Sequence, residues 1–189
     1  MPVWYSGVRG SIPLGGTRFK SSKMDLVPVE YDSMTIYVMP DYYMESGVRV
    51  SVGLTRAFEI ADEKDMMLPT PAMVDAIWEQ AHIKLDPKPL PPSNEMTSYN
   101  YLIQHETVVN EQLKAYGDIR GKLIAGHKKD IVNIDRNNSR VAIYGWHRSS
   151  GRPIQPYSTV HGREYHDYSH GLRLVSKTAK KNGRKMRFQ

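Results

Sequence analysis

The stretch KLIAGHKKDIVNIDRNNSRVAIYGWH, residues 122–147, decides the fold class. Its two halves, 122–134 and 140–147, are rich in β-branched and other apolar residues, and the segment DRNNS between them consists of turn-forming residues. This pattern predicts two antiparallel strands joined by a turn. A third strand is expected at 171–175, after a polar and aromatic loop that spans 148–170.

The part of the chain before residue 122 predicts a hairpin and three helices. Short β-branched runs at 34–39 and 48–52 favour two paired strands joined by a tyrosine-bearing loop. Thr55, Thr70 and Thr97 are typical helix caps, and Pro71 suits a first helical position. We expect these helices to end near residues 62, 82 and 115, with a stiff proline-rich connector at 86–92. Helices followed by antiparallel strands predict a single-domain α+β fold.

Both ends of the chain differ from its centre. Residues 1–30 carry scattered Gly, Pro and Ser without a regular period, which predicts an extended N-terminal arm. Residues 177–189 form a basic C-terminal tail, so the globular α+β domain is expected to span 31–176. The tail suits contact with anions or nucleic-acid phosphates, and it equally suits a frayed terminus in solvent. Its basic residues are Lys177, Lys180, Lys181, Arg184, Lys185 and Arg187.

The composition of the 189-residue chain restricts its chemistry. Cysteine is absent, which excludes thiol nucleophiles, zinc fingers, iron–sulfur clusters and disulfides. The formal net charge of +6 and the 40% hydrophobic content are ordinary for a globular protein. No run approaches the ~20 apolar residues that a membrane-spanning helix needs, and the start lacks the apolar core of a secretory signal. We therefore expect cytoplasmic synthesis without a membrane span, and a phage particle is one destination that fits.

Histidine clustering is the main functional signal. Five of the seven histidines lie between residues 127 and 170, namely His127, His147, His161, His166 and His170. Histidine can act as an acid, a base or a metal ligand near neutral pH. On the loop HGREYHDYSH, residues 161–170, the side chains of His161, Asp167 and His170 can converge and hold a catalytic zinc. Glu164 or His166 would then support a ligand or act as the base.

Two alternatives to a zinc site stay open. The loop histidines can instead be structural, hydrogen-bonded groups among tyrosines. The second alternative is phosphodiesterase chemistry in GHKKD, residues 126–130, where His127 and Lys129 match the start of the HxKxxxxD motif. The match is out of register, because Ile134 occupies the required Asp position. Strand alternation alone also places His127 and Lys129 on one face. In a hydrolase, His127 and His147 would polarise the scissile group, and Lys128 or Lys129 would stabilise developing negative charge.

Outside this cluster, one helical histidine is expected to be structural. His105 lies on the apolar side of the helix that Thr97 begins. We expect it to be buried with its ring nitrogens hydrogen-bonded, as buried polar groups usually are.

Four blocks of sequence resemble a family of uncharacterised bacterial and bacteriophage-type proteins. They are LPTPAMVDAIW (68–78), AGHKKDIV (125–132), RVAIYGWH followed by GRPIQP (140–156), and YHDYSHGLRLV (165–175). The resemblance covers roughly residues 34–176. It implies a bacterial or phage context, and it implies that the histidine-rich third belongs to the domain. The family has no established activity, so no catalytic residue follows from the resemblance.

Three functions compete on these observations, and the sequence leaves open whether the protein is an enzyme. The first is a His/Asp-site hydrolase, with zinc as a candidate cofactor, that acts on a bacterial cell-envelope polymer such as peptidoglycan or another glycan. The second is a non-enzymatic assembly protein, such as a phage virion component, whose arm and tail contact neighbouring subunits. The third is nucleic-acid binding through the basic tail.

Overall fold

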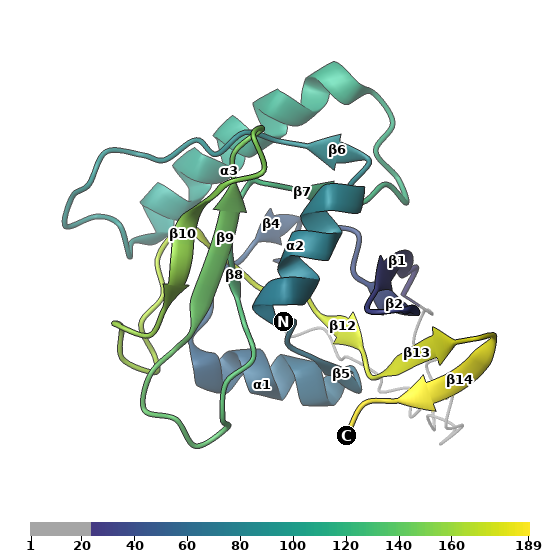
Figure 1. Ribbon diagram of the computed structural model, residues 1–189. Coiled ribbons are helices and arrows are strands. Elements are labelled where there is room, and N and C mark those ends of the chain that lie inside the picture. Colours follow the sequence, from purple (N-terminus) through teal and green to yellow (C-terminus); the bar gives the residue numbers. More distant parts are fainter. Residues whose placement is uncertain (1–23) are drawn as a thin grey trace, which may run out of the picture.

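The computed structural model describes residues 24–189, and the hairpin around DRNNS is present in it (Figure 1). Strand β8 (Lys129–Ile131) pairs antiparallel with β9 (Ile143–His147), and β10 (Pro153–Ser158) pairs antiparallel with the other side of β9. β11 (His170–Gly171) adds to β8 in parallel. The order β10-β9-β8-β11 places β9, which carries His147, and β11, which carries His170, on either side of β8, the strand that follows His127.

A second sheet joins the two ends of the described chain. Its strand order is β14-β13-β2-β12-β5, and β1 also pairs with β2. The strands are β1 (Val27–Tyr31), β2 (Met34–Val38), β5 (Met66–Met67), β12 (Val175–Ser176), β13 (Thr178–Lys181) and β14 (Arg184–Arg187). Two small pairs complete the strands, β3 (Met44–Glu45) with β4 (Val48–Arg49) and β6 (Ile83–Lys84) with β7 (Ile124–Ala125).

The three helices begin close to the predicted caps. They are α1 (Leu54–Glu63), α2 (Pro71–Gln80) and α3 (Tyr99–Leu113), the last continuing as a short 3₁₀ turn, Lys114–Tyr116. Thr70 Oγ1 accepts a hydrogen bond from the Met73 amide at 3.2 Å, as expected for an N-cap followed by proline. Ser98, not Thr97, caps α3 by accepting from the Tyr101 amide. Helices and mostly antiparallel strands in one domain confirm the α+β prediction.

Several strand predictions were wrong in their pairing or length. The 34–39 run does not pair with 48–52, because Asp32 and Ser33 adopt positive φ and form a tight turn that returns the chain from β1 to β2. The last four residues of the arm predicted for 1–30 therefore belong to a strand, β1, and residues 1–23 of that arm lie outside the described residues. The 122–134 strand is broken into β7 and β8 around Gly126, whose φ is +98°.

The other differences lie in the last third of the chain. The loop 148–170 contains an unpredicted strand, β10. The predicted strand 171–175 is split between the two sheets, since Gly171 pairs with β8 and Val175 pairs with β2 and β5. The basic segment 177–189 forms the β13–β14 hairpin, with Ala179 buried and Met186 and Phe188 packed on the core.

The core lies between the helices and the two sheets. One apolar cluster packs Phe58 and Ile60 of α1 against Ile131 and Ile143 of the four-stranded sheet. A second packs Met73 and Ile77 of α2 against the strands that include Ile36 and Val38. Val109 and Leu113 of α3 pack on the β6–β7 pair. α3 is thereby held beside the histidine-bearing loop, where the candidate site is found.

Candidate active site

A cavity of about 330 Å³ opens between three segments that are distant in sequence. One wall is the chain just before α1, the second is the N-terminal end of α3, and the third is the loop that carries His166 and Asp167. Val50, Val52 and Leu102 supply apolar lining. A cavity of this size with a few polar groups is typical of a small-ligand site.

A serine and a histidine meet in this cavity. Ser51 Oγ and His166 Nδ1 lie 3.1 Å apart, and both side chains are partly buried. Burial lowers the pKa of His166, while the nearby carboxylates of Asp167 and Glu164 act in the opposite direction. The net lowering keeps the ring neutral at pH 7, so that it can accept a proton from the hydroxyl. A hydroxyl within hydrogen-bond reach of a neutral imidazole is the arrangement of an activated nucleophile.

The beginning of α3 adds hydrogen-bond donors to the same cavity. Ser98 Oγ already satisfies the amide of Tyr101, and the Ser98 amide bonds to the Glu95 carbonyl. The amide of Tyr99, which lines the cavity at the first helical position, has no partner within the helix. The positive end of the helix dipole thus lies next to Ser51 and His166, where it favours negative charge.

Asp167 is held as an anion beside His166. Its Oδ1 accepts from both the amide and the hydroxyl of Ser169, at 2.8 and 2.6 Å, and its Oδ2 accepts from Tyr165 Oη at 3.1 Å. Burial raises the pKa of Asp167, but the electrostatic interaction with the His170 ring and the two Ser169 hydrogen bonds outweigh this effect, and the pKa is lowered. An ionised Asp167 would stabilise the imidazolium that forms when His166 takes up a proton.

The three predicted zinc ligands do come near one another, around the ring of Tyr165. His161 stacks on that ring with centroids 4.0 Å apart, and His170 meets it edge-on at 5.8 Å. His170 Nε2 lies 3.8 Å from Asp167 Oδ2, and burial lowers the pKa of His170 to about 4. Within residues 24–189, no group of three or more His, Asp and Glu side chains is placed to hold a metal ion. Zinc therefore stays a sequence-based prediction.

Two of the other predicted catalytic residues lie away from the cavity lining. His127 is fully buried and bonds through Nε2 to Asp41 Oδ1 at 2.8 Å, and burial lowers its pKa to about 4. His147 bonds to Asp75 Oδ1 at 2.7 Å and stacks on Trp78.

The remaining two are also held by partners of their own. Lys129 lies over the Trp146 ring, with Nζ 5.3 Å from the centroid. Glu164 accepts from the hydroxyl of Thr55 and pairs with Arg163. The structure therefore distributes the predicted catalytic set over several places, and of that set only His166 lines the cavity.

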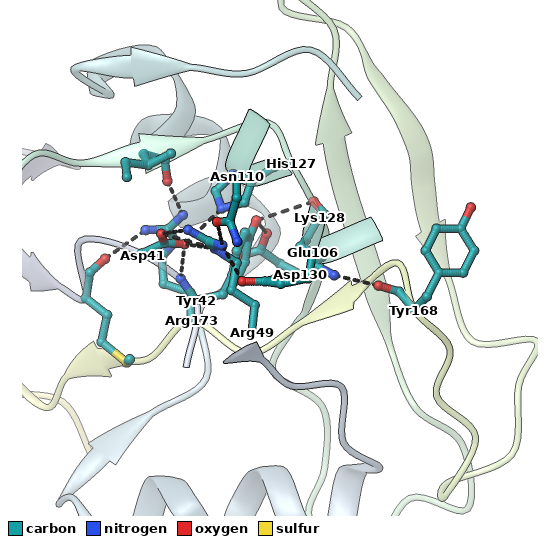
Figure 2. A network of polar contacts seen from close by, with 12 residues as sticks. Asp41, Tyr42, Arg49, Glu106, Asn110, His127, Lys128, Asp130, Tyr168 and Arg173 are labelled. Atoms are coloured by element: carbon teal, nitrogen blue, oxygen red, sulfur yellow. Dashed lines mark hydrogen bonds and ion pairs between the residues drawn. The ribbon is translucent and has the colours of Figure 1, made fainter. Parts of the chain in front are cut away.

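A buried ionic network, shown in Figure 2, fixes two walls of the cavity. Arg49, two residues before Ser51, binds Asp41 at 2.7 Å and Glu106 of α3 at 2.8 Å. This pairing ties the Ser51 segment to α3. Because both carboxylates and the guanidinium are nearly excluded from water, each charge depends on its partner.

The same network reaches the histidine loop through a lysine. Lys128 is fully buried, and its Nζ donates to the Tyr168 carbonyl at 2.6 Å, two residues after His166. Burial lowers the pKa of Lys128 to about 8. Asp130 accepts from Tyr42 Oη at 2.5 Å, and burial raises the pKa of Asp130 to about 6. The GHKKD segment thus acts as a support for the loop that carries His166.

Sequence reasoning missed Ser51, because it lies 115 positions from His166 and no local motif marks it. It also missed Arg49 and Asp41, which a sequence gives no reason to expect in the interior. His105 is buried as predicted, but both its ring nitrogens lack hydrogen-bond partners among the described residues. The ring packs instead edge-on against Trp146 and Tyr168.

No family model matches the chain, and no similar protein was found among curated proteins or among solved structures. The resemblance drawn from the four sequence blocks therefore stays a prediction. Among the helices of residues 24–189, none is both long and apolar enough to cross a bilayer.

Proposed function

We propose that the protein is a hydrolase in which Ser51 is the nucleophile and His166 the general base, acting on an ester or amide bond. The observation that carries this proposal is the 3.1 Å contact between Ser51 Oγ and His166 Nδ1 inside the cavity. The pair gives the predicted histidine hydrolase a nucleophile that the sequence did not reveal.

The reaction would run in two balanced steps. Ser51 Oγ forms a bond to the substrate carbonyl carbon while its proton moves to His166 Nδ1, and the carbonyl electron pair moves onto oxygen. The amide of Tyr99 would stabilise that oxyanion. When the carbonyl re-forms, the C–O or C–N bond breaks and the leaving group takes the proton from His166. Water then attacks the acyl-enzyme with the same proton transfers, which releases the acid and restores Ser51.

The cavity supports a small acyl group as the bound moiety. Val50, Val52 and Leu102 provide an apolar surface next to the reacting hydroxyl. The proposed polymer is a bacterial envelope component, and it rests on the sequence resemblance alone. Within that class, the bonds that this chemistry cleaves are the peptide amides of peptidoglycan and the O-acyl esters of glycans, not glycosidic bonds.

The proposal is tested with an alkyl fluorophosphonate, which forms a P–O bond with an activated serine and releases fluoride. Mass spectrometry of a protease digest is expected to find the adduct on Ser51. Ser51→Ala should abolish labelling, and His166→Gln should slow it at least about 100-fold, because general base catalysis typically contributes that much.

Ser149→Ala is the matched control. Ser149 is exposed, and its side chain has no histidine partner in the described residues, so the variant should label at the wild-type rate. Far-ultraviolet circular dichroism would verify that each variant is folded. A folded wild type that leaves Ser51 unlabelled, or that labels equally well without His166, would overturn the proposal.

A further inference from the structure

The last two strands of the chain, β13 and β14, form a basic hairpin, and none of its residues lines the cavity that holds Ser51. All 20 acidic residues lie between Asp25 and Asp167, so neither the first 24 residues nor the last 22 contain a carboxylate side chain. The β13–β14 hairpin carries five cations. Arg187 pairs with Asp65 at 2.8 Å. The other four make no ion pair within residues 24–189, and they are Lys180, Lys181, Arg184 and Lys185.

The register of the hairpin places like charges directly opposite each other. Lys180 faces Lys185, and Lys181 faces Arg184. Like charges at cross-strand positions destabilise a hairpin on its own. The arrangement is therefore costly for the free protein and becomes favourable when an anion lies along the ribbon.

Alternation distributes these cations over both faces of the ribbon. Ala179 and Met186 face the core, and Lys181 and Arg184 follow on that same face further toward the turn. Lys180 and Lys185 project from the other face. The turn residues Asn182 and Gly183 both have positive φ, as a tight two-residue hairpin turn requires. Figure 1 shows the hairpin extending from the edge of the sheet, away from the three helices.

We propose that the β13–β14 hairpin binds double-stranded nucleic acid by entering a groove of the duplex. The major groove of B-DNA admits a two-stranded β-ribbon, and phosphates line both of its walls. A ribbon inside the groove needs cations on both faces, whereas a ribbon lying flat on a polyanion needs them on one. The two like-charged pairs, one on each face, meet the first requirement.

Charges on an edge strand also protect against unwanted strand pairing, and β14 is such an edge. Protection of the edge requires charged side chains, but these can be positive or negative. Reversing the sign of the four cations preserves edge protection and removes attraction to phosphate, so reversal separates the two roles. It also leaves the buried Ala179 in place, which deletion of the segment would not.

The experiment measures fluorescence anisotropy of a labelled DNA duplex of about 20 base pairs at 50 and 200 mM salt. Four phosphate contacts give a slope of about −3.6 in log K against log salt, so wild-type affinity should fall at least roughly 150-fold over this range. The variant K180E/K181E/R184E/K185E should lose this contribution. The double variants K180E/K185E and K181E/R184E reverse the charges on one face each. With two phosphate contacts left, the affinity of each should fall only roughly 12-fold between the two salt concentrations.

The matched control reverses four exposed cations outside the hairpin, in K88E/K122E/R148E/R152E. It produces the same change in net charge and should retain the wild-type salt dependence. Equal loss in the control would show that overall charge, not the hairpin, attracts DNA, and would overturn the proposal. Effects confined to one face, or equal affinity for a single strand, would overturn insertion into a groove. The two double variants decide the question if the quadruple variant does not fold.

Discussion

Removal of Arg49 should be among the most costly single changes in this protein. The residue is 2% exposed, and its guanidinium donates to both oxygens of Asp41, to Glu106 Oε1 and to Asn110 Oδ1. Arg49→Met keeps most of the aliphatic volume but leaves two carboxylates without their shared cation. His127 continues to bond to Asp41, so the larger loss falls on Glu106.

Breaking a buried ion pair by removing one partner costs about 3–5 kcal/mol, because the remaining charge stays out of water. A domain of this length has a total stability of about 5–15 kcal/mol. Since 1 kcal/mol shifts Tm by about 2–4 °C at this size, Arg49→Met should lower Tm by roughly 6–20 °C. The variant should remain folded at 25 °C but unfold at much lower urea concentration.

The assay is urea and thermal unfolding of Arg49→Met, Glu106→Gln and the double variant. We expect a coupling free energy of about 1–3 kcal/mol between the two positions, because the double variant removes the charge that the single variant strands. Arg56→Met is the control, since Arg56 pairs with Glu59 and Glu63 on the exposed side of α1, where solvent screens the pairs, and its removal should change stability little. A loss below about 1 kcal/mol for Arg49→Met, or no coupling, would refute the reasoning.

Three further predictions concern the backbone, acid stability and metal. Gly126→Ala should cost at least about 2 kcal/mol more than Gly121→Ala in urea unfolding, because only at Gly126 would a Cβ lie 2.0 Å from a backbone oxygen, that of Leu85. Burial lowers the folded-state pKa of His105 to about 3. As the pH falls below 6.5, the His105 ring therefore binds a proton in the unfolded chain but not in the folded one, and this favours unfolding. Between pH 7 and 5 the wild type should therefore lose about 2 kcal/mol more than His105→Phe, and parallel pH profiles would contradict this assignment. Treatment with EDTA should leave fluorophosphonate labelling of Ser51 intact, because neither Ser51 nor His166 is a predicted zinc ligand. The zinc hypothesis would be favoured if EDTA abolished labelling, and if the protein contained stoichiometric zinc that the His161→Ala variant lacked.

The assembly hypothesis stays a prediction alongside the hydrolase. It rested on an irregular arm and a basic tail that contact neighbouring subunits. In the structure the tail is instead a hairpin, paired with β2 through Lys180 and Thr35. Sedimentation of the full chain over a range of concentrations would measure whether copies associate.

The sequence predicted the helices well, because helix signals are local. Thr70 and Pro71 lie next to the helix they start, and the apolar period of α2 is complete within ten residues. The β8–β9 hairpin was predicted for the same reason, since the turn and both strands are contiguous. The 34–39 run, by contrast, had two possible partners, and only the tight turn at Asp32 and Ser33 selects β1.

The composition and the local patterns by themselves determined the α+β class, the absence of thiol chemistry, the three helices and the histidine-rich loop. Tertiary structure alone decided which of those histidines meets a nucleophile. Ser51 and His166 come together because Arg49 binds α3 and Lys128 binds the Tyr168 carbonyl, contacts between segments 40 to 57 residues apart. Such contacts depend on the burial of charges from several elements at once, and no sequence period records that.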